Sequence, residues 1–176
     1  MPQPLVIVLI VLGSLLALWV LLLIVNLIFV SSFNAIFKKH RKALTVILYT
    51  KYENMNRLFS VINQNGINYD NRLNALLSDI DVNTFNEPEK PEFEKSKNSL
   101  AYLKDEIMFV CNQNKELQED LEFVQVKKNI EESDLMYRNN VTMYNADVLG
   151  YNYWINFLPC RFVFKMFKVK RKEIIS

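Results

Sequence analysis

The chain has 176 residues, with 21 basic and 19 acidic side chains and a formal net charge of +2, which is enough for one modest folded domain beside a targeting or membrane segment. Hydrophobic residues make up 51% of the chain and only 3 residues are glycine, a composition that favours long helices over tight turns. It argues against a glycine-rich nucleotide-binding loop and against an all-β sandwich.

An uncharged apolar segment covers residues 5–30. As a helix it would extend about 39 Å, which exceeds the roughly 30 Å hydrocarbon core of a bilayer. It lacks the basic start, the short apolar stretch and the cleavage site of a secretory signal. The sequence therefore predicts a transmembrane anchor over residues 1–32. Asn26 is expected near the lipid headgroups, and a helix-pairing contact is the alternative.

Basic residues follow this segment, and none precedes it. The first four, which are expected at the membrane interface, are Lys38, Lys39, Arg41 and Lys42. The positive-inside rule then predicts a single-pass plasma-membrane protein with its N-terminus outside and the rest of the chain in the cytoplasm. In that reducing compartment Cys111 and Cys160, which lack CxxC spacing, are expected to be buried thiols rather than a disulfide or a metal site.

Beyond the anchor, apolar residues recur every three or four positions, which is typical of helices that bury one stripe. The anchor is expected to continue without a break into the first of these helices, which ends at the turn residues Asn65 and Gly66. A short second helix is predicted over about residues 70–83, with Asp70 or Asn71 as its cap.

A third helix is predicted after the proline-containing segment 86–91, with Pro91 in its first turn and an end or bend at 111–114. A fourth is predicted from about residue 115 to 157. Its stripe consists of Tyr137, Val141, Tyr144, Val148, Tyr151 and Ile155. Tyrosines at this spacing are expected in a core, although a ligand site is the alternative. The predicted fold is all-α: the anchor helix continues into an antiparallel four-helix bundle, residues 33–158, with long first and last helices.

Residues 159–176 form a basic, aromatic tail, which such a topology brings back to the membrane. The residues expected at the interface are Arg161, Phe162, Lys165, Phe167, Lys168, Lys170, Arg171 and Lys172. Aromatic and cationic side chains suit an anionic leaflet. They also suit nucleic acid, but the anchor holds the tail near lipid, so we predict the lipid bilayer, with anionic lipid contact, and no nucleic-acid partner.

Charge is unevenly distributed along the chain. Residues 43–160 contain 11 basic and 18 acidic side chains, whereas the flanking segments are strongly basic. The acidic residues expected at the end distal to the membrane are Asp79, Asp81, Glu87, Glu89, Glu92 and Glu94. This face is a candidate docking surface for a basic protein partner, and a merely solvated face is the alternative.

Several motifs resemble the bacterial LemA family. They are KYENMNRLFSVI at 51–62, LQEDL at 117–121, YRNNVTMYN at 137–145 and LPCRFVFKMFKVK at 158–170. Arg138 and Asn56 depart from the family pattern. The residues that carry the resemblance or the expected core are Leu117, Leu121, Tyr137, Val141, Tyr144, Asn145, Val148, Tyr151 and Pro159. The resemblance implies a membrane helix followed by a helical bundle, but it implies no activity, because the family has no established biochemical function.

No catalytic, metal-binding or cofactor-binding residues are predicted, and a lone His40 does not make a metal site. We therefore predict a non-catalytic, membrane-anchored bundle that scaffolds or docks a partner at the inner leaflet. The alternative from another class is a self-assembling coiled coil or membrane-remodelling protein, in which the stripes pair between chains. An enzyme with a site at a subunit interface is a third, weaker alternative.

Overall fold

The computed structural model describes residues 3–86, 91–157 and 160–175. This part of the chain is all-helical, with 87% helix and no strand, which confirms the predicted all-α class. The chain divides into two compact units: a terminal unit, Met1–Lys38 with Met143–Ser176, and a central unit, Lys39–Thr142. The three-part division at residues 32 and 158 stays a prediction.

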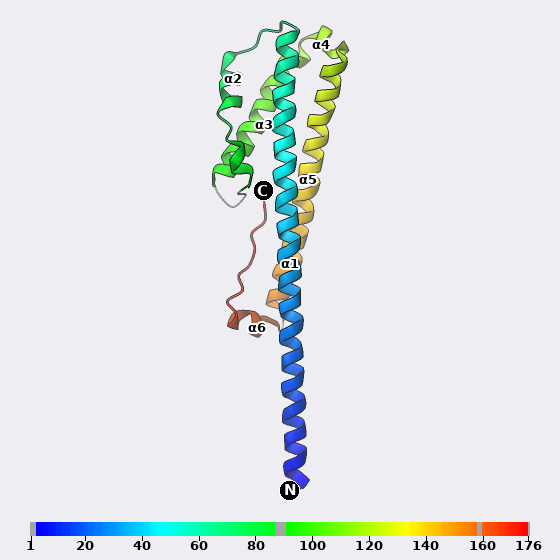
Figure 1. The fold of residues 1–176 in the computed structure, drawn as a ribbon, viewed down its shortest axis with the longest axis vertical. Helices are drawn as coiled ribbons and strands as arrows, with labels where there is room; N and C mark the ends of the chain where they lie inside the picture. The colour runs from blue at the N-terminus through cyan, green and yellow to red at the C-terminus, as the bar shows by residue number, and fades with distance from the viewer. Residues whose placement is uncertain (1–2, 87–90, 158–159, 176) are drawn as a thin grey trace. The chain divides into compact units, whose positions relative to one another are not determined.

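The first helix, α1 (Gln3–Gln64), runs for 62 residues and contributes to both units (Figure 1). Its end has a local cause. Gly66 adopts a φ of 65°, and the amides of Gly66 and Ile67 donate hydrogen bonds of 3.1 and 3.2 Å to the carbonyls of Asn63 and Ile62. This is the left-handed glycine stop of a Schellman motif. The predicted continuation of the anchor and the predicted stop are both confirmed.

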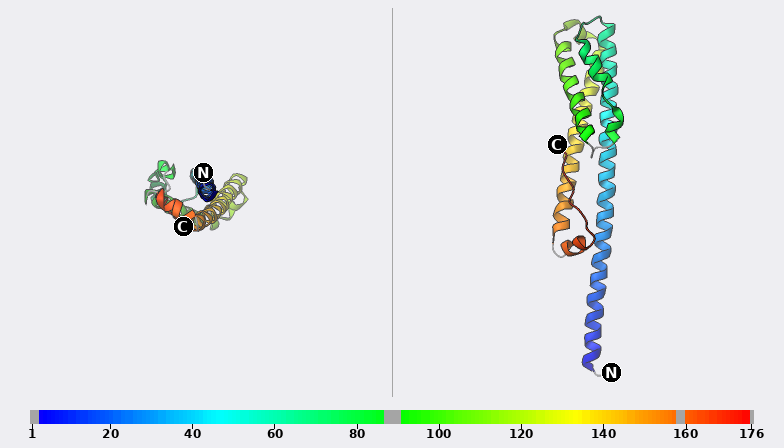
Figure 2. Two further views of the ribbon diagram at one scale, coloured as in Figure 1. Left: turned by 90° about the horizontal axis from the view of Figure 1, so that it is seen from below. Right: turned by 90° about the vertical axis from the view of Figure 1, so that its left-hand side faces the viewer.

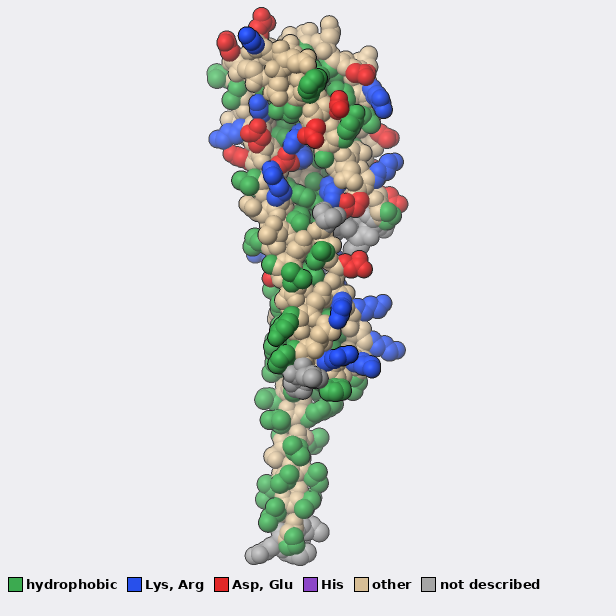
Figure 3. Space-filling model, turned by 180° about the vertical axis from the view of Figure 1, so that it is seen from behind, with side chains coloured by type: hydrophobic (Ala, Val, Ile, Leu, Met, Phe, Trp, Pro, Cys, Tyr) green, Lys and Arg blue, Asp and Glu red, His purple; other side chains and the backbone are tan. Residues whose placement is uncertain are grey.

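The first part of α1 is exposed although it is apolar. Ile10 and Leu16 are each 66% exposed, and the most apolar 18-residue window is 0% buried. In the space-filling view this stretch carries no charged side chain (Figure 3). Within the described residues α1 is the one helix that is long and apolar enough to cross a membrane. By its length and composition, this exposed apolar stretch could cross a membrane.

The central unit packs part of α1 with α2 (Asn71–Ser78), the 3-10 helix η1 (Val82–Asn86), α3 (Pro91–Asn112), α4 (Lys115–Glu119) and the start of α5 (Leu121–Asn156). Figure 2 shows α3 and the start of α5 running along α1. Their buried side chains form one hydrophobic core. Leu100, Leu103 and Ile107 are each 0% exposed, as predicted. α3 begins at Pro91, as expected, and it ends at Asn112.

The second predicted helix, 70–83, is shorter in the structure. Asp70 is its N-cap, and its carboxylate accepts a hydrogen bond of 2.8 Å from the Arg72 amide. After Ser78 the chain leaves the helix and enters η1. Asp81 causes the change, because its Oδ1 accepts the Asn83 amide at 2.9 Å in an Asx turn.

The fourth predicted helix, 115–157, is two helices, because the chain breaks at Asp120. Its backbone is extended (φ −71°, ψ 120°), and its Oδ1 accepts the amide of Phe123 at 2.8 Å, so Asp120 caps α5. The hydrogen bond from Phe123 lowers the pKa of this carboxyl. The break turns Leu121 outward: this motif residue is 86% exposed and is not part of the core, whereas Leu117 is buried.

In the terminal unit, aromatic side chains of α1 pack on α5 at successive levels. Phe29 stacks on Trp154 with ring centroids 4.7 Å apart, and the Phe33 ring lies 5.8 Å from Tyr151. The rest of this core is Phe37, Tyr144, Val148, Ile155, Cys160 and Phe164. The predicted stripe is therefore buried from Tyr144 to Ile155, whereas Tyr137 and Val141 are only half-buried.

Candidate functional site

The predicted tail begins with a short amphipathic helix, α6 (Cys160–Met166). Val163 and Phe164 are buried, whereas Phe162 is 70% exposed beside the exposed cations Arg161 and Lys165. Phe167, directly after the helix, is also exposed. Cationic and aromatic side chains therefore share the open face of α6, which is the composition of an interfacial helix.

An apolar hollow of about 310 Å³ lies between α6 and the exposed part of α1. Its lining residues are Trp19, Leu22, Phe162, Val163 and Met166. The hollow shows that α6 packs at the level of Trp19 and Leu22, well before the end of the predicted span at residue 30.

Asn26 is one helical turn beyond Leu22 and is 1% exposed. Its Nδ2 donates to the Leu22 carbonyl at 2.7 Å, and its Oδ1 has no hydrogen-bond partner among the described residues. Packing within the terminal unit covers this side chain, and its expected position near the lipid headgroups stays a prediction. The buried indole Nε1 of Trp154 also lacks a partner in the described part of the chain.

After α6 the chain reverses and runs back along α5 in an extended conformation (Figure 1). Lys168 makes the reversal, with a φ of 53° and an amide that donates to the Lys165 carbonyl at 3.2 Å. The Val169 amide closes the turn by donating to the Phe164 carbonyl at 3.0 Å. Sequence analysis did not foresee that residues 169–175 would be held against α5.

Two asparagines of α5 hold this extended segment. Asn145 donates from Nδ2 to the Ile175 carbonyl at 2.8 Å, and its Oδ1 accepts the Ile175 amide at 2.9 Å. Asn152 makes the same pair of bonds with Lys172, at 2.8 and 3.0 Å. Each side-chain amide therefore pairs with the main chain of one residue, as a neighbouring β-strand would.

The tyrosine before each asparagine contacts the same segment. The hydroxyl of Tyr144 donates to the Glu173 carbonyl, and that of Tyr151 donates to the Lys170 carbonyl, both at 3.4 Å. We call Tyr144, Asn145, Tyr151 and Asn152 the Tyr-Asn ladder. Asn145 belongs to the motif identified in the sequence, but Asn152 does not. The signal that could have found Asn152 is the repetition of Tyr-Asn after seven residues.

The predicted interface residues are mostly exposed, and they belong to both units. On α1, Lys38, Lys39 and Lys42 are exposed and Arg41 is half-buried. Around α6 and in the tail, Arg161, Lys165, Lys168, Lys170 and Arg171 are exposed, while Lys172 is half-buried on the ladder. Lys38 belongs to the terminal unit and the other three cations of α1 belong to the central unit. Pro159 lies outside the described residues.

In the central unit a half-buried carboxylate joins three helices. Asp134 of α5 accepts hydrogen bonds from Lys51 of α1 at 2.5 Å and from Lys104 of α3 at 2.7 Å. Burial raises the pKa of Asp134, but the bonds from the two lysines outweigh it, and the net pKa is lowered. This contact was not predicted from the sequence.

Two further polar groups of the central unit are partly buried. His40 Nδ1 lies 3.0 Å from Asn140 Oδ1, so this imidazole is oriented by an amide of α5. The hydroxyl of Tyr137 has no hydrogen-bond partner among the described residues, and burial, with a contribution from Glu94, raises its pKa to about 12. Tyr137 is therefore a neutral phenol at physiological pH.

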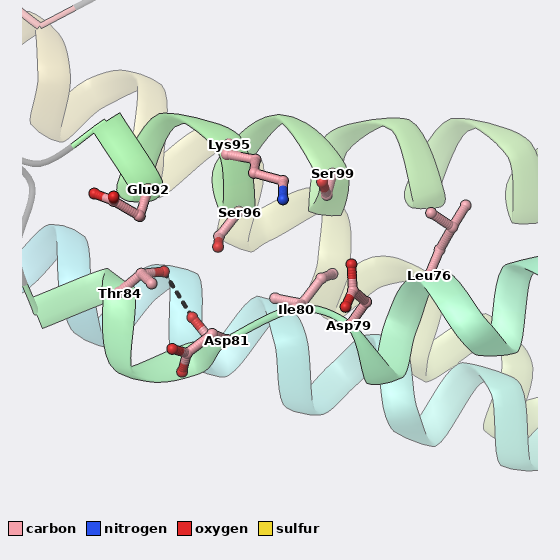
Figure 4. Close-up of a pocket in the computed structure, with 9 residues that line it drawn as sticks. All are labelled: Leu76, Asp79, Ile80, Asp81, Thr84, Glu92, Lys95, Ser96 and Ser99. Atoms are coloured by element: carbon pink, nitrogen blue, oxygen red, sulfur yellow. Dashed lines mark hydrogen bonds between the residues drawn. The ribbon is translucent and has the colours of Figure 1, made fainter.

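Some of the acidic residues predicted for the distal end line a hollow of about 160 Å³ between the α2–η1 segment and α3, but Glu94 does not and pairs with Lys97 at 2.5 Å. Asp79 points into it from one side, and Lys95 and Ser96 point toward it from the other (Figure 4). Asp81 and Glu92 also line it, whereas Glu87 and Glu89 lie outside the described residues.

Within residues 3–86, 91–157 and 160–175, no group of three or more His, Cys, Asp or Glu side chains could hold a metal ion. Comparisons with protein-family models, with curated proteins and with solved structures found no match to this chain. The resemblance to the LemA family therefore stays a prediction.

Proposed function

We propose that this chain is a non-catalytic, single-pass membrane protein that presents a cytoplasmic helical bundle as a docking scaffold at the inner leaflet of the plasma membrane. One observation carries the proposal: α1 is a single helix whose apolar start is 0% buried in its most apolar window, while its later residues, such as Leu58 and Ile62, are 0% exposed. A helix of this kind connects a lipid-facing segment to a packed domain.

The bundle itself is proposed to be the antiparallel four-helix arrangement. Its four elements are the later part of α1, α2 with η1, α3 and α5. Buried side chains of all four meet in one core, for example Leu58, Leu77, Leu103 and Phe123. The connections between successive elements are short, as in up-down bundles.

The position of α6 supports a shorter membrane span than the apolar segment alone. Backbone at a chain reversal and lysine side chains are costly in hydrocarbon, so α6 belongs at the interface. Because α6 packs at the level of Trp19 and Leu22, the hydrocarbon core is proposed to end near Leu22. Residues 5–22 still extend about 27 Å as a helix, which is close to the roughly 30 Å required.

In this arrangement α6 is an interfacial helix. Phe162 and Phe167 would enter the acyl boundary, while Arg161 and Lys165 would meet lipid phosphates. Each basic side chain near an anionic surface contributes about 1 kcal/mol. The position of α6 would therefore set the depth and the tilt of the anchor in the bilayer.

The orientation can be tested with cysteine reporters, because the native Cys111 and Cys160 are buried. Pro4, in the terminal unit, and Gln113, in the central unit, are both exposed. An impermeant maleimide should label Pro4→Cys in intact spheroplasts of an expressing bacterium, but should label Gln113→Cys only after the membrane is opened. The unmodified chain is the control, and the reverse labelling pattern would refute the orientation.

The acidic hollow is proposed to dock a basic protein partner. Pull-down from crosslinked native membranes should recover this partner with the full chain and lose it with Asp79→Asn, Asp81→Asn and Glu92→Gln combined. Asn at position 81 keeps the oxygen that accepts the Asn83 amide, so the turn into η1 is retained. The matched control neutralises the exposed Glu106, Glu119 and Glu131. Equal recovery by both variants would argue against the docking face.

A second candidate, self-assembly at the membrane, is favoured by an exposed stripe on α5. Met143, Ala146, Gly150, Tyr153 and Phe157 alternate spacings of three and four, and all are exposed. Such a seam suits helix pairing between copies. Light scattering of the detergent-solubilised chain decides between the two: a dimer that Met143→Glu dissociates and Val46→Glu does not would favour assembly, while a monomer would exclude an obligate assembly.

A further inference from the structure

The Tyr-Asn ladder is a repeated structure. Each pair contacts the extended segment in the same way: the tyrosine hydroxyl donates to the carbonyl of one residue, and the asparagine brackets the residue two positions later. For Tyr151 and Asn152 these are Lys170 and Lys172; for the preceding pair they are Glu173 and Ile175. Seven residues of α5 therefore match three residues of the segment.

This match has a geometric reason. Seven residues of an α-helix rise about 10.5 Å, and three residues of an extended chain rise about 10 Å. Residues seven apart also lie on nearly the same side of a helix. Asn145 and Asn152 can thus meet the main chain at equivalent points, and the ladder holds any segment that lies extended in this register.

The ladder bonds described above join α5 to main-chain atoms of the segment. The asparagines bond to amide and carbonyl groups, and the tyrosines bond to carbonyls, so these contacts do not select side chains. One further contact does: the Arg171 guanidinium donates to Asn156 Oδ1 at 3.0 Å. Recognition by main-chain bonds with side-chain selection at intervals is the logic of strand addition.

Few side chains of the segment pack on the hydrophobic core. Lys170, Arg171 and Ile174 are exposed, and only Val169 and Ile175 of residues 169–175 pack on the hydrophobic core. The segment is not part of a helix. Most of its specific contacts are thus the ladder bonds themselves, which another extended chain could make equally well.

We propose that the Tyr-Asn ladder of α5 is a binding groove for an extended, basic peptide segment of another protein, and that residues 170–175 occupy this groove as a competing segment of the same chain. The ladder binds the main chain of the ligand, which has an arginine or lysine at the position of Arg171. The groove belongs to the terminal unit and the acidic hollow to the central unit, so this proposal holds or fails independently of the docking proposal.

The test uses a fluorescent peptide with the sequence of residues 168–176, KVKRKEIIS, and the detergent-solubilised chain with and without residues 169–176. The peptide should bind the shortened chain at least about tenfold more tightly than the full chain, because the full chain occupies its own groove. A matched peptide methylated on the main-chain nitrogens of Lys172 and Ile175 cannot donate to the asparagines, and should bind at least about tenfold more weakly.

Protein variants complete the design. In the shortened chain, Asn145→Ala combined with Asn152→Ala should abolish the preference for the unmethylated peptide. Asn139→Ala, at an exposed position of the same helix, should leave it unchanged. Equal binding of the two peptides, or an unchanged preference in the double variant, would overturn the proposal, because charge attraction would then explain the binding. No binding by the shortened chain would overturn it as well, because the groove would then bind no peptide.

Hydrogen exchange on the full chain keeps the proposal testable if the shortened chain loses its helical circular dichroism. Asn145→Ala should speed exchange of the Ile175 amide, and Asn152→Ala should speed exchange of the Lys172 amide, each by at least about tenfold. Unchanged exchange of both amides would overturn the ladder. The added peptide should also speed exchange of these two amides by displacing the segment, and the methylated peptide should not.

Discussion

Lys51 of α1 donates a hydrogen bond of 2.5 Å to Asp134 of α5, across 83 residues of sequence. The lysine side chain is 9% exposed and the aspartate side chain is 16% exposed. Lys104 of α3 bonds to the other carboxylate oxygen at 2.7 Å. One carboxylate thereby pairs with two lysines and joins three helices, at a depth where a lone charge would be costly.

Replacing Asp134 with Asn should destabilise the fold by about 3 kcal/mol, because it leaves the buried Lys51 ammonium without its counter-charge. Urea unfolding followed by circular dichroism measures this change. Asp105→Asn is the matched control: Asp105 lies 3.7 Å from Lys104 but its side chain is 76% exposed, so its loss should cost less than about 1 kcal/mol. Equal losses in the two variants would contradict the assignment.

The same network predicts the pH dependence of stability. The pKa of Asp134 is lowered by its lysine partners against the opposing effect of burial. Its contribution is therefore fully present above the ordinary carboxyl pKa of about 3.9, and it is lost as the pH falls through the lower folded-state value. In Asp134→Asn the acid side of the stability profile should be flatter than in the unmodified chain. A profile of unchanged slope would show that other carboxyls govern acid unfolding.

Asp120 should be required for the start of α5. Asp120→Ala removes the oxygen that accepts the Phe123 amide, so the variant should have a lower melting temperature and a frayed first turn. Asp120→Asn keeps an accepting oxygen and should lie between the alanine variant and the unmodified chain. Thermal unfolding by circular dichroism gives the order. An alanine variant as stable as the unmodified chain would show that α5 needs no cap here.

Cys111 should be chemically inert in the folded chain. It is 0% exposed, and burial raises the pKa of its thiol to about 11, against a smaller opposing effect of Lys127. At pH 7.5 fewer than about one thiol in a thousand would be ionised, and the ionised form is the reactive one. A thiol reagent should therefore modify Cys111 only after denaturation, as mass spectrometry of the labelled peptides can show. Rapid labelling of the native chain would contradict this burial.

Trp19 should lie near the headgroup side of the membrane rather than at its centre, because α6 packs at its level. In a Trp154→Phe background the remaining tryptophan fluorescence comes from Trp19. Lipids brominated near the glycerol backbone should quench it more strongly than lipids brominated at the chain ends. Leu12→Trp in a variant that lacks both native tryptophans is the control for a deep position, and should show the opposite order.

The sequence alone was sufficient for features that depend on neighbouring residues. The apolar stretch predicted the long exposed helix, because hydrophobicity and length are local properties. The spacing of apolar residues at every third or fourth position predicted Leu100, Leu103 and Ile107 in the core. Asn65 with Gly66 predicted the end of α1. The break at Asp120 was missed although its signal is local, because the same residues also suit a helix interior.

Only the tertiary structure decided which distant polar groups meet. Nothing in the residues near Asp134 indicates that its partners are Lys51 and Lys104, since a polar side chain on one helix is compatible with solvent or with many partners. The same holds for Asn145 and Asn152, whose bonds reach residues 30 and 20 positions away. The residue type determines whether a side chain can form a hydrogen bond. The partner of that side chain is determined by the packing that brings two segments together.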